Sequence, residues 1–528
     1  MGRIRNNINI LFKKGPSPLI RKWKARNYGK RKVDGLDKLH LISEEIRLKQ
    51  KSKIFENPEV ISILTPLYNT PPSYLIELLE SMKRQTYKHW ELCLADGSGK
   101  ENTEVGKICK EYMDSDSRFK YLRLEKNRGI SENTNACLSL ATGSYIGLLD
   151  HDDLLHESAL YEVMCAISET RADFLYTDEV KFVNDITKIK DIRAFNFKPD
   201  YGKDELRAHN YICHFTVFHR ELLAREGRSF RAEFDGSQDY DMILRLTEKA
   251  KKIVHIPKVL YYWRVHKESV SYDLEKKKYA VDAAIRGITE QLEREGEYGE
   301  VKSNLPYQTI YRIHYQTESK PFITILHYDT AIESREIEKL NQRAKNAEGK
   351  YLVFLQRDVI MEGSSWQTEL LMYAQRGDVA CVGGKILYPK RKICCAGIAL
   401  DRESESRVRR LCMNMPDEYQ GVEAMLRHVR NTTAVWLGCL MIEKEKFLSL
   451  GGLDPQLGRL AEVDLGIKAA KKGLWNVWTP FAVGKYGGQE KEVDYREGNA
   501  ELLASSWQEE LTKGDGFCHP VLKKYNLV

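Results

Sequence analysis

The sequence predicts an α/β fold built on open sheets, and three observations support that prediction. Apolar, β-branched runs alternate with segments whose apolar residues recur at helical spacing. Acids and turn residues follow directly after several of these runs. The same order of features returns in the second half of the chain, which predicts a second domain of related fold.

The first domain, expected over residues 59–273, alternates strand and helix as such sheets do. Its expected elements are a buried strand, a helix, a strand that ends in an Asp-Gly turn and a strand that ends in acids, at residues 61–69, 74–85, 91–99 and 145–153. In open α/β sheets, ligands bind outside the carboxyl ends of the strands. We therefore expect the chemistry in the loops after Leu67, Leu94 and Leu149.

A segment rich in Lys and Glu is expected to form a solvated helical linker over residues 274–320. The second domain and a C-terminal tail are expected over 321–490 and 491–528, with strands at 322–326, 350–359, 378–389 and 434–442. Two segments of the first domain, 145–153 and 237–257, have counterparts at 351–359 and 461–480. This pattern predicts a degenerate internal duplication, with fusion of two relatives as the alternative.

Residues 1–58 combine a basic arm with a helical connector. The first 32 residues carry 11 Lys and Arg and no acid, so the net charge of +7 for the chain leaves −4 for the rest. Ile4, Ile8, Leu11 and Phe12 recur at helical spacing within the arm. A basic amphipathic segment favours an anionic membrane surface. A solvated tail and a nucleic-acid-binding arm are the alternatives.

Composition and spacing exclude several classes of protein. With 42% hydrophobic and 30% charged residues, the chain is not largely disordered. No GxGxxG follows a strand and no Gly-Lys precedes Ser or Thr, which disfavours dinucleotide oxidoreductases and P-loop NTPases. The sequence also contains neither HExxH nor GxSxG, which disfavours zincins and α/β-hydrolases. The eleven cysteines form no CxxC, and neither a leader nor a membrane-spanning run is expected, which predicts reduced thiols in the cytoplasm.

The run Asp150-His151-Asp152-Asp153 places three carboxylates in four residues, directly after an expected strand. Carboxylates so close repel one another, and a divalent cation that also binds phosphate oxygens is a common reason to gather them. An acid-rich turn that caps a helix from Leu154 is the alternative.

The motifs around this cluster resemble, in order, those of family-2 glycosyltransferases with the GT-A fold, a Rossmann-like open sheet that binds nucleotide diphosphate sugars. The resemblance covers residues 60–270 and is nearest to bacterial enzymes of rhamnan and O-antigen type. The segments that carry it are ISILTPLYN, ESMKRQTYKHWELCLADGSG, NRGISENTNACLSLATGSYIGLLDHDD, ADFLYTDEV, GSQDYDMILRLTE and HIPKVLYYWRVH. It implies a catalytic GT-A domain followed by a degenerate GT-A-like domain.

The resemblance also implies where the donor nucleotide binds. Asp96 is similar to the family Asp that hydrogen-bonds the base, although Gly97 stands where many relatives have a second acid. The other positions assigned to donor binding are Thr65, Pro66, Tyr68, Asn127, Asn133, Asn135 and Asp150. The three asparagines are equally typical of turns and caps.

For the cofactor, the resemblance implies Mg²⁺ or Mn²⁺ bound by Asp150 and Asp152, with His266 completing the site. A structural role is the alternative for His266. Asp239 lies where the family has its catalytic base, although an Asp in the first turn of a helix is also favoured by the helix dipole. A cation makes a nucleotide diphosphate a good leaving group, so one base suffices to deprotonate the acceptor hydroxyl.

The implied function is inverting, metal-dependent transfer from a UDP- or dTDP-linked sugar, such as dTDP-rhamnose, to a growing cell-surface polysaccharide or lipid-linked oligosaccharide. The implied partners are a nucleotide sugar, a glycan or polyprenyl-linked glycan acceptor, the anionic inner face of the plasma membrane and other polysaccharide-synthesis enzymes, with no nucleic acid. Two rival classes remain. A nucleotide-sugar-binding protein without turnover has no need of Asp239, and a nucleic-acid-binding protein leaves the acid cluster unexplained.

The second domain resembles only the later half of the family. Fewer than 30 residues separate Ile323 from the strand at Lys350, too few for the strand, helix and strand that carry the base pocket. In place of the acid cluster stands Gln356-Arg357-Asp358, where Arg357 would repel a cation. Glu462 and Asp464 remain near the base position. We expect a non-catalytic or acceptor-holding domain.

Overall fold

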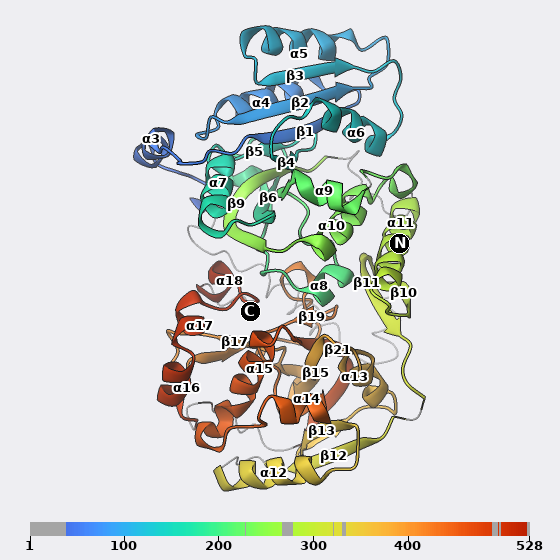
Figure 1. Cartoon of the computed structure of the whole chain (residues 1–528), viewed down its shortest axis with the longest axis vertical. Helices are drawn as coiled ribbons and strands as arrows, with labels where there is room; N and C mark the ends of the chain where they lie inside the picture. Colours follow the sequence, from blue (N-terminus) through green and yellow to red (C-terminus); the bar gives the residue numbers. More distant parts are fainter. Residues whose placement is uncertain are drawn as a thin grey trace.

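Two open sheets follow one another along the long axis of the molecule, one in each half of the chain (Figure 1). The computed structural model describes residues 38–227, 229–266, 278–319, 321–329, 334–487, 495, 498–524 and 528. The basic arm at residues 1–32 lies outside the described residues. Among the helices that are described, none combines the length and the apolar character that crossing a membrane requires.

The first sheet has the strand order β3-β2-β1-β4-β8-β6-β9-β5, and β7 pairs with β6. Strands β1 to β4 run parallel, and β8 lies antiparallel between β4 and β6. The strand bounds are β1 Ile61–Leu67, β2 Trp90–Asp96, β3 Phe119–Arg123, β4 Tyr145–Leu148, β5 Leu154–Leu155, β6 Phe174–Phe182, β7 Ile192–Asn196, β8 Thr216–His219 and β9 Ile253–Arg264. The expected strands at 61–69, 91–99 and 145–153 are thus confirmed.

Helices pack on this sheet, and β1 shows why its sequence is a continuous apolar run. Ile61 and Ile63 belong to one core cluster and Leu64 to the other, so both faces of the strand are buried. The helices are α3 Glu44–Ser52, α4 Pro72–Lys83, α5 Thr103–Ser115, α6 Ile130–Leu140, α7 Ala159–Thr170, α8 Lys203–Ala208, α9 Arg220–Glu226 and α10 Gln238–Lys249. The helix expected at 74–85 corresponds to α4.

The register of the parallel strands brings their carboxyl ends to one edge of the sheet. Leu67 at the end of β1 pairs with Asp96 at the end of β2, and Leu64 pairs with Leu148 at the end of β4. The loops that follow these three strands therefore leave the sheet together, as the sequence predicts.

The expected solvated linker differs from the structure in two respects. It contains α11, Lys278–Arg294, but also a hairpin of β10, Gly299–Asn304, and β11, Tyr307–Tyr315. Moreover, α11 is not solvated on all sides, because its Ala283, Gly287 and Ile288 are buried. It packs on α10, and an added Cβ at Gly287 would lie 3.8 Å from Leu244, which is an ordinary van der Waals distance.

The second sheet repeats the first. Its order is β12-β13-β20-β15-β21-β14, which matches β1-β4-β8-β6-β9-β5 strand for strand, and each neighbouring pair has the same parallel or antiparallel sense. The bounds are β12 Ile323–Tyr328, β13 Tyr351–Gln356, β14 Val359–Met361, β15 Val379–Tyr388, β20 Cys439–Glu443 and β21 Trp475–Tyr486. The predicted repeat of the fold is therefore confirmed.

The repeat lacks the unit that carries β2, α5 and β3. Between β12 and β13, the described residues contain only α12, Ser334–Asn346. The remaining elements are α13 Trp366–Ala374, β16 Lys392–Cys395, β17 Ile398–Leu400, β18 Val408–Arg410, β19 Arg430–Asn431, α14 Lys444–Ser449, α15 Ala461–Lys471, α16 Ala500–Ser506, α17 Gln508–Lys513 and α18 Pro520–Lys524. The expected tail thus contains α16, α17 and α18.

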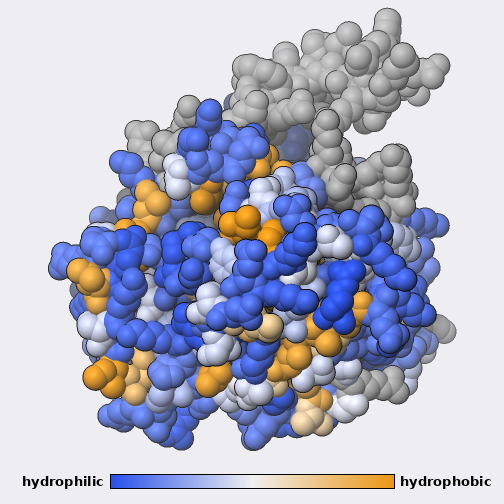
Figure 2. Space-filling view, turned by 90° about the horizontal axis from the view of Figure 1, so that it is seen from above, coloured by the Kyte–Doolittle hydropathy of each residue, from blue (hydrophilic) through white to orange (hydrophobic). Residues whose placement is uncertain are grey.

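The two halves meet through α8 of the first and β19 and α18 of the second, which lie at the junction in Figure 1. The Asn431 Oδ1 on β19 accepts a hydrogen bond of 2.8 Å from the Asp204 N–H at the start of α8. Arg376 pairs with the Asp204 carboxylate, and both residues are buried. Seen from the end that carries β3 and α5, the surface is mostly hydrophilic, with hydrophobic residues in small separate areas (Figure 2).

Candidate active site

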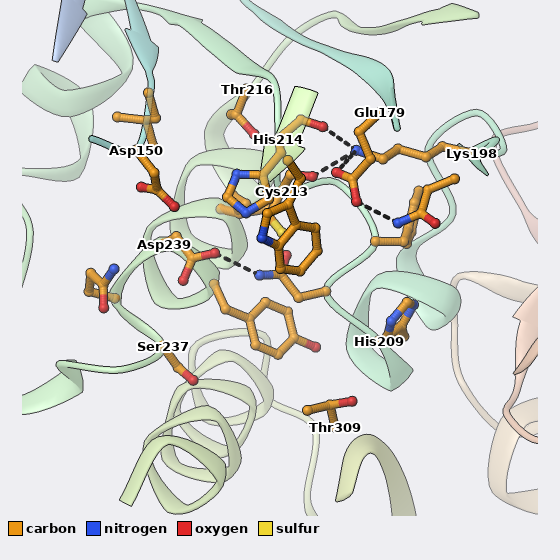
Figure 3. Close-up of a pocket in the computed structure, with 18 of the residues that line it drawn as sticks. Asp150, Glu179, Lys198, His209, Cys213, His214, Thr216, Ser237, Asp239 and Thr309 are labelled. Atoms are coloured by element: carbon orange, nitrogen blue, oxygen red, sulfur yellow. Dashed lines mark hydrogen bonds and ion pairs between the residues drawn. The ribbon is translucent and has the colours of Figure 1, made fainter. Parts of the chain in front are cut away.

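A cavity of about 890 Å³ lies at the carboxyl edge of the first sheet and continues to the junction between the halves. The first half contributes the loops after β1 and β4, the start of α10 and the loop after α8. The second half contributes residues between Val422 and Arg430 and others between Phe517 and Val528. Figure 3 looks into this cavity, with Asp150 and Asp239 on one side and Glu179, Lys198 and His209 on the other.

The acid cluster after β4 lines the cavity through Asp150 and Asp152. The Asp152 Oδ2 lies 2.6 Å from the His266 Nε2, although the two residues are 114 positions apart. Burial raises the pKa of Asp150, and the nearby Asp152 and Asp239 carboxylates raise it further against the opposing effect of His214. Carboxyl groups are therefore crowded here, as the sequence predicts.

Asp153, the third acid of the cluster, has a different environment. Its Oδ2 accepts a hydrogen bond of 2.6 Å from the Tyr261 hydroxyl, and its Oδ1 accepts one of 2.6 Å from the Arg264 N–H. Both donors belong to β9, so the carboxylate fastens the loop after β4 to that strand. Asp153 thus has a structural role that leaves Asp150 and Asp152 for a ligand.

The donor set in the cavity fits a hard divalent cation, because Mg²⁺ and Mn²⁺ prefer carboxylate oxygens and Mn²⁺ also accepts imidazole. Among the described residues, one group whose possible ligand atoms all lie within 4.8 Å of one another is Asp150, Asp153 and His214. Asp152 and His266 form a separate pair beside it. The three expected ligands thus lie on one side of the cavity, but not in one tight cluster.

Asp239 lies in the first turn of α10 and lines the same cavity. Its Oδ2 accepts a hydrogen bond of 3.0 Å from the Asn210 Nδ2. Among the described residues, no backbone N–H donates to this carboxylate, so the side chain does not cap the helix. Figure 3 shows it facing the same space as Asp150.

The predicted donor-binding residues divide into two groups. Pro66, Tyr68, Asn127, Asn133 and Asp150 line the cavity, whereas Thr65, Asp96 and Asn135 do not. The fully buried Asp96 carboxylate accepts hydrogen bonds from the Ser98 N–H, the Tyr121 hydroxyl and Arg123, at 2.9, 2.8 and 2.5 Å. The Asn135 amide exchanges hydrogen bonds of 2.8 and 3.0 Å with the backbone of Phe230, which gives it a structural role.

Some residues of the cavity carry no signal that sequence reasoning recognised. Lys198 is buried and donates to the carbonyls of Cys213 and His214, at 2.7 and 2.5 Å, and pairs with Glu179 at 3.3 Å. The His214 ring stacks on Tyr261, with centroids 4.8 Å apart. Glu179 lies in the motif ADFLYTDEV, which indicated the family but gave this residue no role.

A second group of residue types that bind metals consists of Asp178, His255 and His519, of which His519 lines the cavity. Asp178 accepts hydrogen bonds from the Nε2 atoms of His255 and His519, both at 2.9 Å. The Val521 N–H donates to the His519 Nδ1 at 3.1 Å, so the proton of a neutral ring lies on Nε2 and points at Asp178. This arrangement fits a hydrogen-bonded link between the C-terminal segment and β6 better than a metal ligand.

Comparisons with known proteins match the first half of the chain to a family profile and most of the chain to individual relatives. Residues 62–227 match the sequence profile of the family described as glycosyl transferase family 2. The chain is 32% identical over 498 residues to the uncharacterized protein y4gI of Sinorhizobium fredii, covering 83% of this chain and 54% of that protein. It is 28% identical over 478 residues to the O-antigen biosynthesis protein RfbC of Myxococcus xanthus, covering 80% and 36%.

The chain thus spans about half, or less, of the length of these two relatives. Among solved structures, S. aureus TarS 1–349 is 17% identical, with 49% of this chain and 98% of that chain covered and a TM-score of 0.34.

Proposed function

Because residues 62–227 belong to glycosyl transferase family 2, we propose that this chain transfers a sugar from a nucleotide diphosphate sugar to a glycan hydroxyl, with inversion at the anomeric carbon. The proposal rests on the position of three carboxylates. Asp150 and Asp152 reach the cavity from the loop after β4, and Asp239 reaches it from the start of α10. Asp150 and Asp152 are suited to bind a cation together with a diphosphate. Asp239 is suited to deprotonate the acceptor hydroxyl.

On the donor side, the nucleotide would lie against the loop after β1 and the start of α6. Pro66 and the half-exposed Tyr68 offer apolar surface to a base or ribose. The Asn127 Oδ1 accepts a hydrogen bond of 2.8 Å from the Asn133 Nδ2, which holds both amides at the cavity wall. UDP- and dTDP-linked sugars are the proposed donors.

A divalent cation, when bound, would neutralise the charge that develops on the departing diphosphate. Asp152 and His266 would hold it together with Asp150. The hydrogen bond of 2.6 Å between Asp152 and His266 brings two of these ligands together before any cation arrives. Neutralisation of the acids would also offset the crowding that raises the pKa of Asp150.

Asp239 would then take the proton from the attacking hydroxyl. The hydrogen bond from Asn210 engages its Oδ2 and leaves Oδ1 for the acceptor. Attack from the side opposite the diphosphate inverts the anomeric centre, and no protein acid is needed because the leaving group departs as an anion.

Asp239→Asn tests this assignment. The variant should bind the nucleotide as tightly as the wild type, because the nucleotide does not need the charge, while transfer falls by about 10²- to 10⁴-fold. Calorimetry and the release of nucleotide diphosphate from a panel of nucleotide sugars in Mn²⁺ measure the two quantities. Glu104→Gln, an exposed acid in the first turn of α5, is the matched control. Normal transfer in Asp239→Asn would rule out the base.

The proposed acceptor follows from the name of a relative, since RfbC is described as an O-antigen biosynthesis protein. A cell-surface polysaccharide or a lipid-linked precursor, extended in the cytoplasm together with other enzymes of that synthesis, fits the proposed transfer.

Such an acceptor would lie at the membrane, and the 11 basic side chains of residues 1–32 would attract the chain to anionic lipid. Deletion of these residues should abolish sedimentation with vesicles that contain phosphatidylglycerol and leave transfer to a soluble acceptor intact. Equal sedimentation of both proteins would contradict the tether.

A further inference from the structure

We propose that Arg430 of the second half, together with Glu205 and Asn210 of the first, forms a subsite that binds the hydroxyl groups of an uncharged sugar in the acceptor. This inference rests on the proposed function, because it names what occupies the cavity beyond Asp239. The cavity continues from Asp239 along α8 to β19, which lies at the junction of the two halves.

Arg430 is the residue that carries the inference. It lies on β19, lines the cavity, and is only 1% exposed. Nevertheless its Nε and Nη1 have no hydrogen-bond partner among the described residues. A buried guanidinium without partners is unfavourable, because its donors lose water and gain nothing in exchange. Donors of this kind at a cavity wall indicate a ligand that accepts from them.

Glu205 supplies hydrogen-bond acceptors, where Arg430 supplies donors. It lies on α8, is 8% exposed and lines the same cavity. Burial raises the pKa of its carboxyl to about 7, and Arg430 is the charged group that opposes this shift. Among the described residues, no side-chain hydrogen bond is made by this carboxyl group. It therefore offers acceptors beside the donors of Arg430.

Asn210 extends the set toward Asp239. Its Nδ2 donates to the Asp239 carboxylate, while its buried Oδ1 has no partner among the described residues. The Oδ1 of Asn196, which also lines the cavity, is likewise without one. Helix α8 is fixed in place because the Tyr240 hydroxyl, one residue after Asp239, donates to the Leu206 carbonyl at 2.5 Å. The unpaired Asn210 acceptor thus lies directly beside the proposed base, to which the same side chain donates.

The mixture of donors and acceptors selects the class of ligand. A hydroxyl both donates and accepts, so a sugar can satisfy all of these atoms at once. A carboxylate or phosphate would satisfy only Arg430 and would be repelled by Glu205 and Asp239 when these are ionised. Three other ionisable groups of the cavity wall, His209, His428 and Lys198, add little attraction for an anion. Burial lowers the pKa of His209 to about 3 and of His428 to about 4, and Lys198 is paired with Glu179.

The test uses the full chain with UDP and Mn²⁺ present, and a panel of neutral methyl glycosides, methyl glucuronide and inorganic phosphate as probes. Binding is measured by saturation-transfer NMR and by calorimetry. At least one neutral glycoside should bind to the wild type. Arg430→Met should weaken the affinity for that glycoside by at least 10-fold. The melting temperature should not fall, because the substitution removes donors that have no partner within the protein. Arg402→Met, exposed in the same half of the chain, is the matched control.

Glu205→Gln is the second variant. It keeps the shape of the side chain and should also weaken the binding of the glycoside. The inference is overturned if both variants bind glycosides normally, or if phosphate or glucuronide binds more tightly than every neutral probe. If Arg430→Met lowers the melting temperature but still binds the glycoside, Arg430 has a structural role and the inference is also overturned. Failure of the proposed function is a separate result. Release of nucleotide diphosphate would then be absent, while Arg430-dependent glycoside binding would persist.

Discussion

At the scale of the residue, neighbouring acids of one motif have opposite environments. Asp153 has both oxygens occupied by donors from β9, whereas Asp152 contacts His266 at the cavity. The Asp153 side chain is buried against β9, whereas the Asp152 side chain is partly exposed and lines the cavity. A motif of consecutive acids therefore contains one structural member and two that suit a ligand.

Glu205 gives a residue-scale prediction for the dependence of stability on pH. Burial raises the pKa of its carboxyl from 4.5 to about 7 in the folded protein. Between these values the unfolded chain is ionised and the folded one is not, so stability falls as pH rises toward 7 and stays lower above it. Glu205→Gln should raise the free energy of unfolding at pH 8 by about 3 kcal/mol.

The control for this prediction is the same comparison at pH 4.5, where both the folded and the unfolded wild type hold much of the proton and the gain should be small. Urea unfolding at the two pH values measures it. A gain of equal size at both would show that shape or packing, and not ionisation, explains the effect.

At the scale of the element, α15 repeats the position of α10 with a closed site. Glu462 accepts hydrogen bonds from the Tyr495 hydroxyl and from the Leu437 N–H, and the Trp507 Nε1 donates to Asp464 at 3.0 Å. Tyr495 and Trp507 come from the C-terminal segment. The acids near the second base position are thus enclosed by protein, whereas Asp239 faces a cavity, which supports a second half without catalysis.

Two helical glycines offer an element-scale prediction with opposite signs. An added Cβ at Gly287 of α11 would find its nearest neighbour at 3.8 Å, whereas one at Gly466 of α15 would lie 2.5 Å from the Thr433 carbonyl oxygen. Gly287→Ala should therefore stabilise the protein by up to about 1 kcal/mol through helix propensity. Gly466→Ala should destabilise it by about 1 to 3 kcal/mol through overpacking. Thermal unfolding measures the stability of both variants. If both melting temperatures shift in the same direction, the packing described for one of the two glycines is contradicted.

At the scale of the whole molecule, the repeated sheet does not repeat the donor site. The second half lacks counterparts of β2, α5 and β3 in its described residues, and Arg357 follows β13 where acids follow β4. Its contribution to the cavity comes instead from β19 and the C-terminal segment. We infer a division of labour in which the first half binds the donor and the second shapes the acceptor side.

This division predicts one nucleotide site in each chain. Titration of the full chain with UDP or dTDP in Mn²⁺ should give a single class of site, and Asp152→Asn should remove it, because the amide keeps the shape but loses the charge that attracts the cation. Asp114→Asn, an exposed acid on α5, is the control. A second site, or residual metal-dependent binding in Asp152→Asn, would place nucleotide binding elsewhere in the molecule.

The sequence by itself determined the features that depend on local pattern. The apolar run of β1 predicted a buried strand, the spacing in α4 predicted a helix, and the short segment between Ile323 and Lys350 excluded a complete second donor unit. These features could be predicted because strand and helix leave periods in the chain, and because a missing unit leaves a missing length.

Only the tertiary structure decided which polar groups are open to a ligand. Asp152 meets His266 across 114 positions, and Arg430 reaches the cavity of the first half from β19. Whether a side chain is paired or open depends on partners that lie far away in the sequence, and no local pattern records them. The same reason explains why Asp96, although predicted for the base, is engaged by Tyr121 and Arg123, while Arg430 carries no motif at all.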